Sequence, residues 1–594
     1  MARPSPPREV DTVVIGNGPS ALLLSYILHG HSPYYVGGHH DPILHAKLVA
    51  KPNLLDLAPD RYAHFQSSLR YSTQALPVNT LLDTLIRPNA DTEVNPTPCV
   101  EWRSEPAQRV PHVVVGATGH AGGQWAEETA EAEGDVGTLS YAEMLSLPGY
   151  TYSEHLAKSQ RQQQCDFVRP SRREVADYLR AYPAAVGIED AVYTRTRVDG
   201  VKRDAGGFWI GSLGIKCKHL VLASGIFTVN IPPPALLEPL TQLHIEPSQL
   251  HQEPLLVIGS GFSAADVIIA APPNRNILHI FQWAPDSRPS PLKGCHHTAY
   301  PEYAAVYRQM KLAAIAAHKS VPVNSPLMRR KSNPFFRQRD WSTFYEGLPN
   351  ASVLDVSVIA GSNTATVTLQ LASGETVTRR VSGLEYVVGR RGSLDYLSSS
   401  LRSEVLGTDV PASPLISGRT LRAKAEMSLE VARDVFIIGS LAGDSLIRHA
   451  VGGCVFTAGR ILGHIPPTRF ATSSFPSLSS SHPSSTSDTS ISISASASAS
   501  ASASSRSTSP SPNLPSDSLD VDASSTKSSN SSTPLQTSTA PSADASPSIL
   551  ANGHSDLHLD RRKLALAVEV ASVQNRVWRE SGWWAGGLGP ASMK

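Results

Sequence analysis

The stretch Val10-Asp-Thr-Val-Val-Ile-Gly16-Asn-Gly18-Pro-Ser-Ala21 decides the fold class. A β-branched apolar run ends at a glycine-rich turn, and an apolar helical segment begins directly after it. This order of strand, turn and helix is the context in which a G-x-G-x-x-A sequence binds a dinucleotide. Gly16 makes the tight turn, Gly18 lets the backbone approach a pyrophosphate, and Ala21 is small enough for the helix to pack closely on the strand.

The N-terminus of that helix, opened by Pro19 and Ser20, is expected to hold the pyrophosphate of FAD through free N–H groups and the helix dipole. The alternative is a purely structural turn. Such a site usually carries an acidic residue about 20 positions further on, where it binds the adenosine ribose. The second strand reads Tyr34-Tyr-Val-Gly-Gly-His-His40 and the nearest acid is Asp41, so we expect another group to hold the ribose.

The same order recurs far downstream, in Leu255-Leu-Val-Ile-Gly259-Ser-Gly261-Phe262-Ser263-Ala. Two such motifs predict two nucleotide sites, one for FAD and one for the nicotinamide cofactor that reduces it. The alternative is a degenerate repeat that binds nothing. The next strand, His279–Trp283, has neither a base nor an acid at its end, and Arg288 and Lys293 follow it. These two bases favour NADPH, with NADH as the alternative.

A Gly-Gly pair and a tryptophan follow the apolar run Val113-Val-Val115, in Gly119-His-Ala-Gly122-Gly123-Gln-Trp125. The glycines permit close backbone approach and Trp125 supplies an aromatic wall, similar to the G-G-x-W that flavin-dependent monooxygenases carry beside the flavin ring. The alternative is an ordinary glycine-rich turn with a packed tryptophan. A further strand ends in Ala223-Ser-Gly225, which resembles the A-T-G turn where the chain leaves the FAD domain of two-domain flavoproteins.

Two later segments complete the pattern. Glu385–Gly392 is interpreted as the return crossing, where Arg390 and Arg391 either face a phosphate or are solvated. The run Val435-Phe-Ile-Ile-Gly439-Ser-Leu-Ala-Gly443-Asp444, followed by Gly452-Gly453 at a helix, resembles the G-D motif that ends such FAD domains. In those proteins the Asp accepts a hydrogen bond from the ribityl chain, and the helix N-terminus points at the pyrimidine edge of the flavin. The resemblance makes Gly443, Asp444 and Gly453 candidate cofactor-binding residues, and the alternative for Asp444 is a helix N-cap.

These segments predict an α/β fold with two Rossmann-like dinucleotide-binding domains. We expect an FAD-binding domain in two segments, 8–228 and 381–467, with an NAD(P)-binding domain, 229–380, inserted between them. Residues 468–556 are rich in Ser, Ala and Pro and bury too little apolar surface to fold, which predicts a disordered linker. Residues 557–594 predict a C-terminal helix that docks on the core, or alternatively contacts a partner or a membrane surface.

Composition narrows the function classes. The 594 residues carry a formal net charge of +1, which favours neither nucleic acid nor a membrane surface as a partner. The five cysteines contain no C-x-x-C pair, so we expect neither a zinc site nor a disulfide-reductase pair. The pairs His39-His40 and His296-His297 lack a third ligand at a suitable spacing, so no metal is expected. No apolar run reaches the roughly 20 residues of a transmembrane helix, and the first strand leaves no room for a signal peptide, so the expected compartment is the cytoplasm.

The order of the motifs resembles the oxidative stress-induced growth inhibitor family, relatives of flavin-containing monooxygenases. The resemblance spans about residues 10–465 and also rests on Pro111-His-Val-Val-Val-Gly116 and Tyr300-Pro-Glu-Tyr303. It implies an NADPH-dependent monooxygenase, and associates the chain with growth restraint, cell death and differentiation. The F-x-G-x-x-x-H sequence of flavin-containing monooxygenases is absent, and only His244 falls near its place, which leaves the substrate type open.

We therefore expect an FAD-dependent, NAD(P)H-consuming oxidoreductase, a monooxygenase that acts on a small-molecule substrate and O₂ through a C4a-(hydro)peroxyflavin. Because the cofactor carries the chemistry, no catalytic side chain is assigned. Two alternatives keep the enzyme class: an N-hydroxylating monooxygenase and an uncoupled NADPH oxidase. A third, of another class, is a catalytically degenerate flavoprotein fold that acts as a growth or stress regulator.

Overall fold

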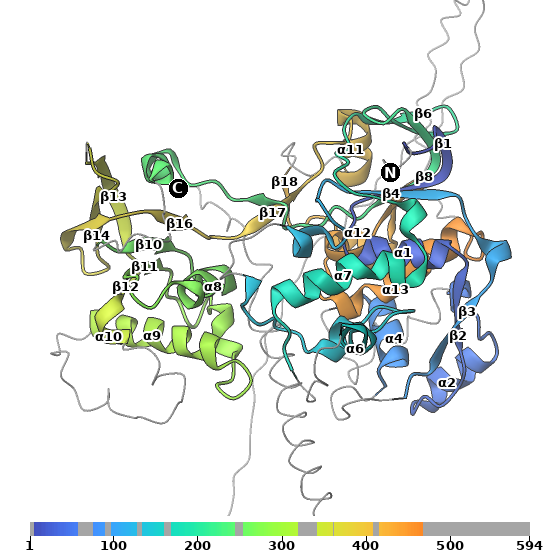
Figure 1. The fold of residues 1–594 in the computed structure, drawn as a ribbon, viewed down its shortest axis with the longest axis horizontal. Helices are drawn as coiled ribbons and strands as arrows, with labels where there is room; N and C mark the ends of the chain where they lie inside the picture. The colour runs from blue at the N-terminus through green and yellow to red at the C-terminus, as the bar shows by residue number, and fades with distance from the viewer. Residues whose placement is uncertain are drawn as a thin grey trace, which may run out of the picture. The chain divides into compact units, whose positions relative to one another are not determined.

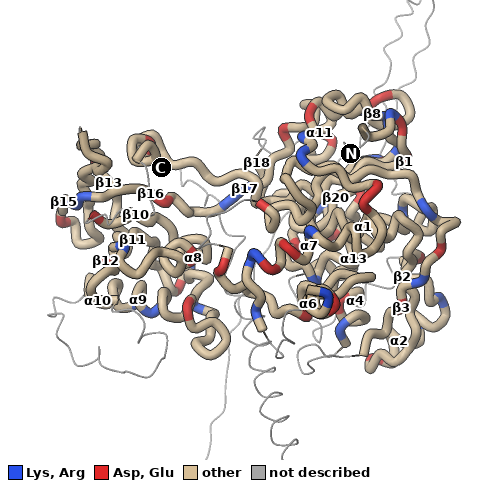
Figure 2. The backbone as a smooth tube through the Cα atoms, viewed as in Figure 1, with Lys and Arg blue, Asp and Glu red and all other residues tan. Residues whose placement is uncertain are grey.

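The computed structural model describes residues 5–57, 75–88, 97–127, 134–159, 168–243, 253–318, 341–359, 361–407 and 415–466. The predicted linker 468–556, the predicted C-terminal helix, Cys165 and His244 lie outside these residues. The described chain is a mixture of helices and strands (Figure 1), and acidic and basic residues are interspersed along it (Figure 2).

The first glycine motif follows a strand inside an eight-stranded sheet. Strand β1 (Glu9–Ile15) runs parallel to β4 (His112–Val115) on one side and to β8 (Ile215–Leu222) on the other. Strand β20 (Val435–Ile437) continues the sheet beside β8, again in parallel. The second half of β1, Val13–Ile15, is buried on both faces and is entirely apolar. The other strands of this sheet are β5 (Val192–Tyr193), β6 (Val201–Asp204), β7 (Gly207–Ile210) and β19 (Glu430–Ala432).

Three helices pack in series beside this sheet. Helix α1 (Pro19–Leu28) follows β1 and packs against α13 (Val451–Ile461), and α13 in turn packs against α4 (Pro77–Ile86) (Figure 1). The contact between α1 and α13 places the first glycine motif close to Val451–Ile461, which lies near the end of the described chain. The remaining helices of this part are α2 (Pro42–Val49), α6 (Tyr152–Lys158), α7 (Arg172–Val186), α11 (Ser399–Leu406) and α12 (Arg422–Met427).

The strand that follows α1 does not lie beside β1. Strand β2 (His31–Tyr35) pairs antiparallel with β3 (Val100–Ser104) in a separate two-stranded sheet, and β4 lies next to β1. Consecutive strands usually lie side by side. However, Pro33 within β2 has no N–H to donate and is unsuited to a strand that is paired on both sides. The segment Tyr34–His40, which was expected to be the second strand, therefore contributes only Tyr34 and Tyr35 to β2.

The second glycine motif follows the middle strand of a four-stranded sheet. Strand β10 (Leu255–Ile258) lies between β11 (Ile277–Phe281) and β16 (Leu384–Tyr386), parallel to both. Helix α8 (Phe262–Ala270) follows the motif and contacts α9 (Pro301–His318). The fourth strand is β12 (Tyr345–Pro349), which follows the short helix α10 (Trp341–Phe344), and an antiparallel sheet of β13 (Ser352–Val358), β14 (Ala365–Gln370) and β15 (Thr376–Val381) shares a hydrophobic core with it.

The predicted fold class is confirmed: the chain is an α/β protein with a mixed sheet that has a parallel centre and a second sheet that is parallel throughout, each carrying a glycine motif at the end of a strand that is paired in parallel on both sides. A third small sheet consists of β9 (Val229–Asn230), β17 (Arg390–Ser393) and β18 (Leu415–Ile416). It lies close to the segments predicted as the two crossings, because β9 follows Ala223–Gly225 and β17 overlaps the end of Glu385–Gly392. The domain boundaries at 228 and 380 stay a prediction.

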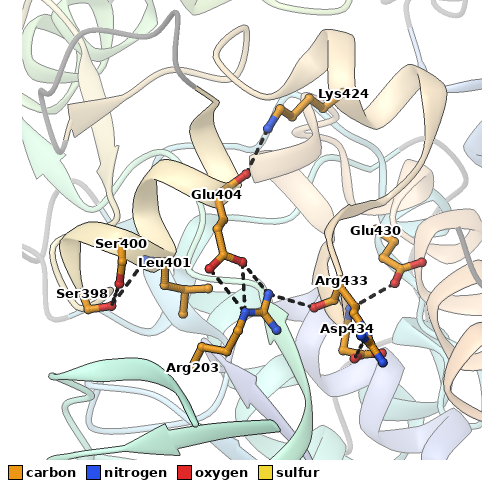
Figure 3. Close-up of polar contacts among 9 residues, drawn as sticks. All are labelled: Arg203, Ser398, Ser400, Leu401, Glu404, Lys424, Glu430, Arg433 and Asp434. Atoms are coloured by element: carbon orange, nitrogen blue, oxygen red, sulfur yellow. Dashed lines mark hydrogen bonds and ion pairs between the residues drawn. The ribbon is translucent and has the colours of Figure 1, made fainter. Parts of the chain in front are cut away.

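Polar contacts secure one edge of the first sheet (Figure 3). Nε of Arg203 in β6 donates to both carboxylate oxygens of Glu404 in α11, at 3.0 and 3.3 Å. Nζ of Lys424 donates to the carbonyl oxygen of Glu404 at 3.3 Å, where a cation suits the negative end of α11. In the β19–β20 turn, the N–H of Asp434 donates to the carboxylate of Glu430 at 3.0 Å. These contacts hold α11 and the β19–β20 turn to the sheet that carries the first motif.

The helices and the cysteines of the described residues bear on membrane spanning and on thiol chemistry. None of the helices in these ranges is both long and apolar enough to cross a bilayer. Four of the cysteines, Cys99, Cys217, Cys295 and Cys454, are buried free thiols. Burial raises the pKa of Cys217 and Cys295 to about 12, so they remain protonated and serve the packing of the core.

Candidate functional site

The turn between β1 and α1 has the form that a pyrophosphate requires. Gly16 has a φ of +121°, and a Cβ there would overlap the carbonyl of Ala223 at the end of β8. Gly18 precedes α1, and no atom lies within 4 Å of the place where its Cβ would be. Open space therefore lies at the N-terminus of an apolar, buried helix, where free N–H groups and the helix dipole favour an anion.

The Gly-Gly-Gln-Trp segment packs directly on this turn. The N–H of Gly122 donates to the carbonyl of Asn17 at 2.8 Å, and a Cβ at Gly123 would lie 2.9 Å from Cα of Gly18. Trp125 lies in the 3₁₀ helix Gly123–Ala126 and packs against the core of the first sheet. The structure thus brings this segment and the first motif together, with Trp125 in a packing position.

The strand beside β1 ends just before Gly116, without an acid. This residue directly follows β4, the strand beside β1, and a Cβ there would overlap the side chain of Asn17. Nδ2 of Asn17 donates to Oγ1 of Thr118 at 2.8 Å and to the carbonyl of His120 at 3.1 Å. A buried amide network therefore stands where a carboxylate is usual. One sequence feature pointed to this arrangement: Gly-Gly-Gln-Trp follows Val113–Val115 closely, and that run is the strand β4 beside β1.

The turns after β8 and β20 meet the first motif at the same edge of the sheet. Gly225 has a φ of +74°, and its Cβ position lies 3.3 Å from Oγ of Ser440. That hydroxyl oxygen accepts the N–H of Ile226 at 3.2 Å. A Cβ at Gly439 would lie 2.5 Å from Oγ of Ser20. The carboxyl ends of parallel strands share one edge of a sheet, so these predicted residues gather around the start of α1.

Asp444 and Gly453 are both bonded to α4. Asp444 is buried, and its Oδ1 accepts from Nη1 of Arg422 at 2.7 Å. Its Oδ2 accepts from the N–H of Leu76 at 2.8 Å and from Nδ2 of Asn79 at 2.5 Å. Oδ1 of Asn79 accepts the N–H of Gly453 at 2.7 Å. Asp444 is not the N-cap of α13, which is Ala450, so the N-cap alternative is wrong for that helix.

One helical turn further along α4, a buried charge cluster continues this contact. Asp83 accepts from Nε of Arg448 at 3.0 Å and from Nη1 of Arg87 at 3.1 Å, and Nε2 of His449 lies 3.8 Å away. Burial raises the pKa of Asp83, but the charges of Arg448, His449 and Arg87 together outweigh it and leave that pKa below its usual value. Burial lowers the pKa of His449. The face of α4 that meets the segment before α13 is therefore polar and charged.

The second glycine motif is secured by a buried histidine that was not singled out from the sequence. Nε2 of His279 in β11 lies 2.7 Å from the carbonyl oxygen of Gly259, and Nδ1 lies 2.8 Å from the hydroxyl of Tyr345. A carbonyl oxygen only accepts, so Nε2 carries the proton and Nδ1 accepts from Tyr345. Burial lowers the pKa of His279 to about 4, which keeps the ring neutral. The sequence feature that could have identified His279 is its position as a polar residue within the otherwise apolar strand Ile277–Phe281.

In the rest of the second motif, Gly261 faces open space and the side chain of Phe262 packs in the core. Gly261 has its nearest neighbour atom, Cγ of Pro291, 3.8 Å from its Cβ position. Phe262 is buried edge-on against Tyr303, with ring centroids 5.2 Å apart, which leaves only its backbone for a ligand. Ser263 is partly exposed in the first turn of α8. The start of α8 therefore resembles the start of α1, because a glycine that faces open space precedes each helix.

The basic residues proposed for phosphates have protein contacts. Nη1 of Arg288 donates to the side chain of Gln282 at 3.3 Å, whereas Lys293 is exposed. Nη1 of Arg390 donates to the carbonyl of Phe227 at 3.3 Å and lies 3.5 Å from the carboxylate of Glu127. Nη1 of Arg391 donates to the carbonyl of Arg390 at 3.0 Å. Arg390 and Arg391 thus brace the crossing strand β17.

The two ends of the first site differ in how they suit FAD. At the start of α1, the open space at Gly18 fits a pyrophosphate. At the start of α13, Asn79 already bonds the carboxylate of Asp444 and the N–H of Gly453, the two groups that would serve the ribityl chain and the pyrimidine edge. The described residues bring no three His, Cys, Asp or Glu side chains together in a metal-binding arrangement.

The chain is similar to proteins named oxidative stress-induced growth inhibitors. Growth inhibitor 1 of Mus musculus is 25% identical over 500 residues, covering 76% of this chain and 94% of the relative. Growth inhibitor 2 of Homo sapiens is 25% identical over 497 residues, covering 75% of this chain and 91% of the relative. The resemblance expected from the motifs is therefore confirmed.

Solved structures with a similar arrangement include a flavin-containing monooxygenase from Stenotrophomonas maltophilia, which is 16% identical with a TM-score of 0.41. The ornithine hydroxylase of Pseudomonas aeruginosa is 14% identical with a TM-score of 0.40. Each alignment covers 77% of this chain and 99% of the other. No model of a protein family matches the chain.

Proposed function

We propose that the protein is an FAD-dependent oxidoreductase that consumes NAD(P)H, and specifically a monooxygenase acting on a small molecule with O₂. One observation carries the proposal. Two glycine turns stand at the carboxyl ends of the strands β1 and β10, in two separate sheets, and each opens the helix that follows. One turn suits the pyrophosphate of FAD and the other that of NADPH, or NADH as the alternative.

The residues proposed for FAD are those that gather around the start of α1 and the start of α13. Gly16 and Gly18 admit the pyrophosphate, and Pro19, Ser20 and Ala21 present the helix N-terminus. The other residues proposed for this site are Gly122, Gly123, Trp125, Gly225, Gly443, Asp444 and Gly453. The proposed nicotinamide site is formed by Gly259, Gly261, Phe262 and Ser263.

Bound flavin would supply hydride acceptance and O₂ activation, and the chain would bind, orient and shield the reactants. His279 holds the carbonyl of Gly259 in place, so that the second turn keeps its form. No protein acid or base is assigned to the chemistry. The substrate stays open.

The test is a reconstitution of the full chain with FAD, followed by NADPH oxidation in air. The proposal expects one FAD per chain and NADPH consumption that rises with a substrate, with one oxygenated product per NADPH. NADPH consumption that yields only hydrogen peroxide favours the uncoupled oxidase. Oxygenated amines as the sole products favour the N-hydroxylating monooxygenase. Absence of FAD uptake contradicts all three.

A second candidate is a regulatory protein that keeps the fold without catalysis. It is favoured by the absence of an acid at Gly116, after the strand beside β1, and by Asn79, which satisfies Asp444 and Gly453 from within the chain. The name of the relatives, oxidative stress-induced growth inhibitor, fits such a role. Binding of a nucleotide without any NADPH oxidation, in the presence of a broad set of amines, ketones and sulfides, would favour this candidate over the enzyme.

A further inference from the structure

Asn79 makes two contacts that a flavin would need. Its Oδ1 accepts the N–H of Gly453 at 2.7 Å, and its Nδ2 donates to Oδ2 of Asp444 at 2.5 Å. A flavin offers the same pair, because its C2 carbonyl accepts and its ribityl hydroxyls donate. We propose that the first turn of α4 blocks the flavin site and acts as its plug. Asn79 makes the contacts of the flavin there until this turn moves away. This inference rests on the proposed function.

The backbone of α4 takes part in the plug as well as the side chain of Asn79. A Cβ at Gly452 would overlap the carbonyl of Val78, so the backbones of the first turns of α4 and α13 are in close contact. A rotation of the Asn79 side chain alone leaves that carbonyl in place. Release of the site therefore requires the turn from Leu76 to Thr80 to move as a unit.

The electrostatics of the contact favour a reversible arrangement. The N-termini of α4 and α13 meet, and the positive ends of two helices repel each other. The carboxylate of Asp444 offsets this repulsion, since it accepts the N–H of Leu76 and the amide of Asn79 at the start of α4. A ligand that donates to Asp444 and accepts from the N–H of Gly453 would replace the contacts on which the docking of this turn depends.

The position of α4 in the sequence is compatible with movement of its first turn. The helix belongs to the segment between α1 and β4, which lies outside the central strand order of the first sheet. Its second anchor, the ion pair of Asp83 with Arg448, lies one turn further along and is independent of Asn79. The proposal requires the first turn of α4, including the buried Leu76 and Val78, to move while this second anchor stays docked.

The test compares FAD binding by the full chain, by Asn79→Ala and by the control Thr84→Ala, using the quenching of flavin fluorescence. Thr84 is on the same helix and contacts His39 instead, through Nε2 at 3.1 Å. The proposal expects Asn79→Ala to bind FAD at least roughly tenfold more tightly than the unmodified chain, equivalent to about 1.4 kcal/mol. Thr84→Ala should bind like the unmodified chain. Equal or weaker binding by Asn79→Ala would overturn the plug.

Hydrogen exchange of the unmodified chain gives a second readout that needs no variant. Addition of FAD is expected to speed the exchange of amides at Leu76–Thr80 and to slow that at Gly16–Ala21. Slower exchange at both segments would mean that α4 stays docked over bound FAD, and would overturn the plug while leaving the proposed function intact. Absence of FAD binding by both the unmodified chain and Asn79→Ala would contradict the proposed function itself.

Discussion

His279 makes the second glycine motif sensitive to acid. The ring is fully buried between the carbonyl of Gly259 and the hydroxyl of Tyr345, and burial lowers its pKa from 6.5 to about 4. The folded chain therefore binds this proton less readily than the unfolded chain. The stabilisation from neutral His279 is complete above the unfolded pKa and is lost as the pH falls from about 6.5 towards 4. A shift of this size corresponds to about 3 kcal/mol.

Two substitutions separate the charge of His279 from its hydrogen bond. In His279→Gln, the amide can still donate to Gly259 but does not titrate, so this variant should lose about 3 kcal/mol less stability than the unmodified chain between pH 7 and pH 4. In His279→Leu, the carbonyl of Gly259 and the hydroxyl of Tyr345 lose their partner, which costs about 1–3 kcal/mol each at pH 7.

The assay is urea unfolding of the three proteins between pH 7 and pH 4, together with NADPH binding at pH 7. His279→Leu should bind NADPH more weakly, whereas His279→Gln should bind it nearly as the unmodified chain does. Identical pH dependence of the unmodified chain and His279→Gln would refute the burial argument. Unchanged NADPH binding by His279→Leu would show that the carbonyl of Gly259 needs no support from β11.

Three further predictions concern the first motif and α4. Gly16→Ala should lose FAD binding and about 1–3 kcal/mol of stability, because alanine must adopt the φ of +121° and overlaps the carbonyl of Ala223; unchanged thermal unfolding would contradict this. Gly18→Ala should fold like the unmodified chain, since its Cβ enters open space, yet titrate with FAD at least about tenfold more weakly, or about 1.4 kcal/mol; equal affinity would place the pyrophosphate elsewhere. Asp83→Asn should destabilise the chain by about 3–5 kcal/mol in urea unfolding, because it removes the carboxylate that faces Arg87 and Arg448; a loss below about 1 kcal/mol would contradict the structure of that cluster.

Local sequence patterns predicted the two nucleotide motifs well. Strands β1 and β10 and helices α1 and α8 occur where the glycine spacing places them, and the helices begin at Pro19 and Phe262. The pattern succeeds here because a tight turn between a parallel strand and a helix needs glycine at fixed positions, whatever the rest of the chain does.

Contacts between distant segments could not be predicted in the same way. Strand β4 lies beside β1 although residues 29–111 separate α1 from it, and β2 lies in another sheet with β3. Asn79 contacts Asp444 across 365 residues of sequence, and nothing in the composition of α4 indicates that partner. The contacts of Asn79 with Asp444 and Gly453 therefore depend on the fold and not on local sequence.

The most direct test of the central claim is the visible absorption spectrum of the full chain after incubation with FAD, recorded before and after anaerobic addition of NADPH. Two nucleotide sites that work together predict flavin bands that remain with the protein after gel filtration and bleach on NADPH. A protein that stays colourless, both unmodified and as Asn79→Ala, would contradict the oxidoreductase and leave the regulatory protein as the better account.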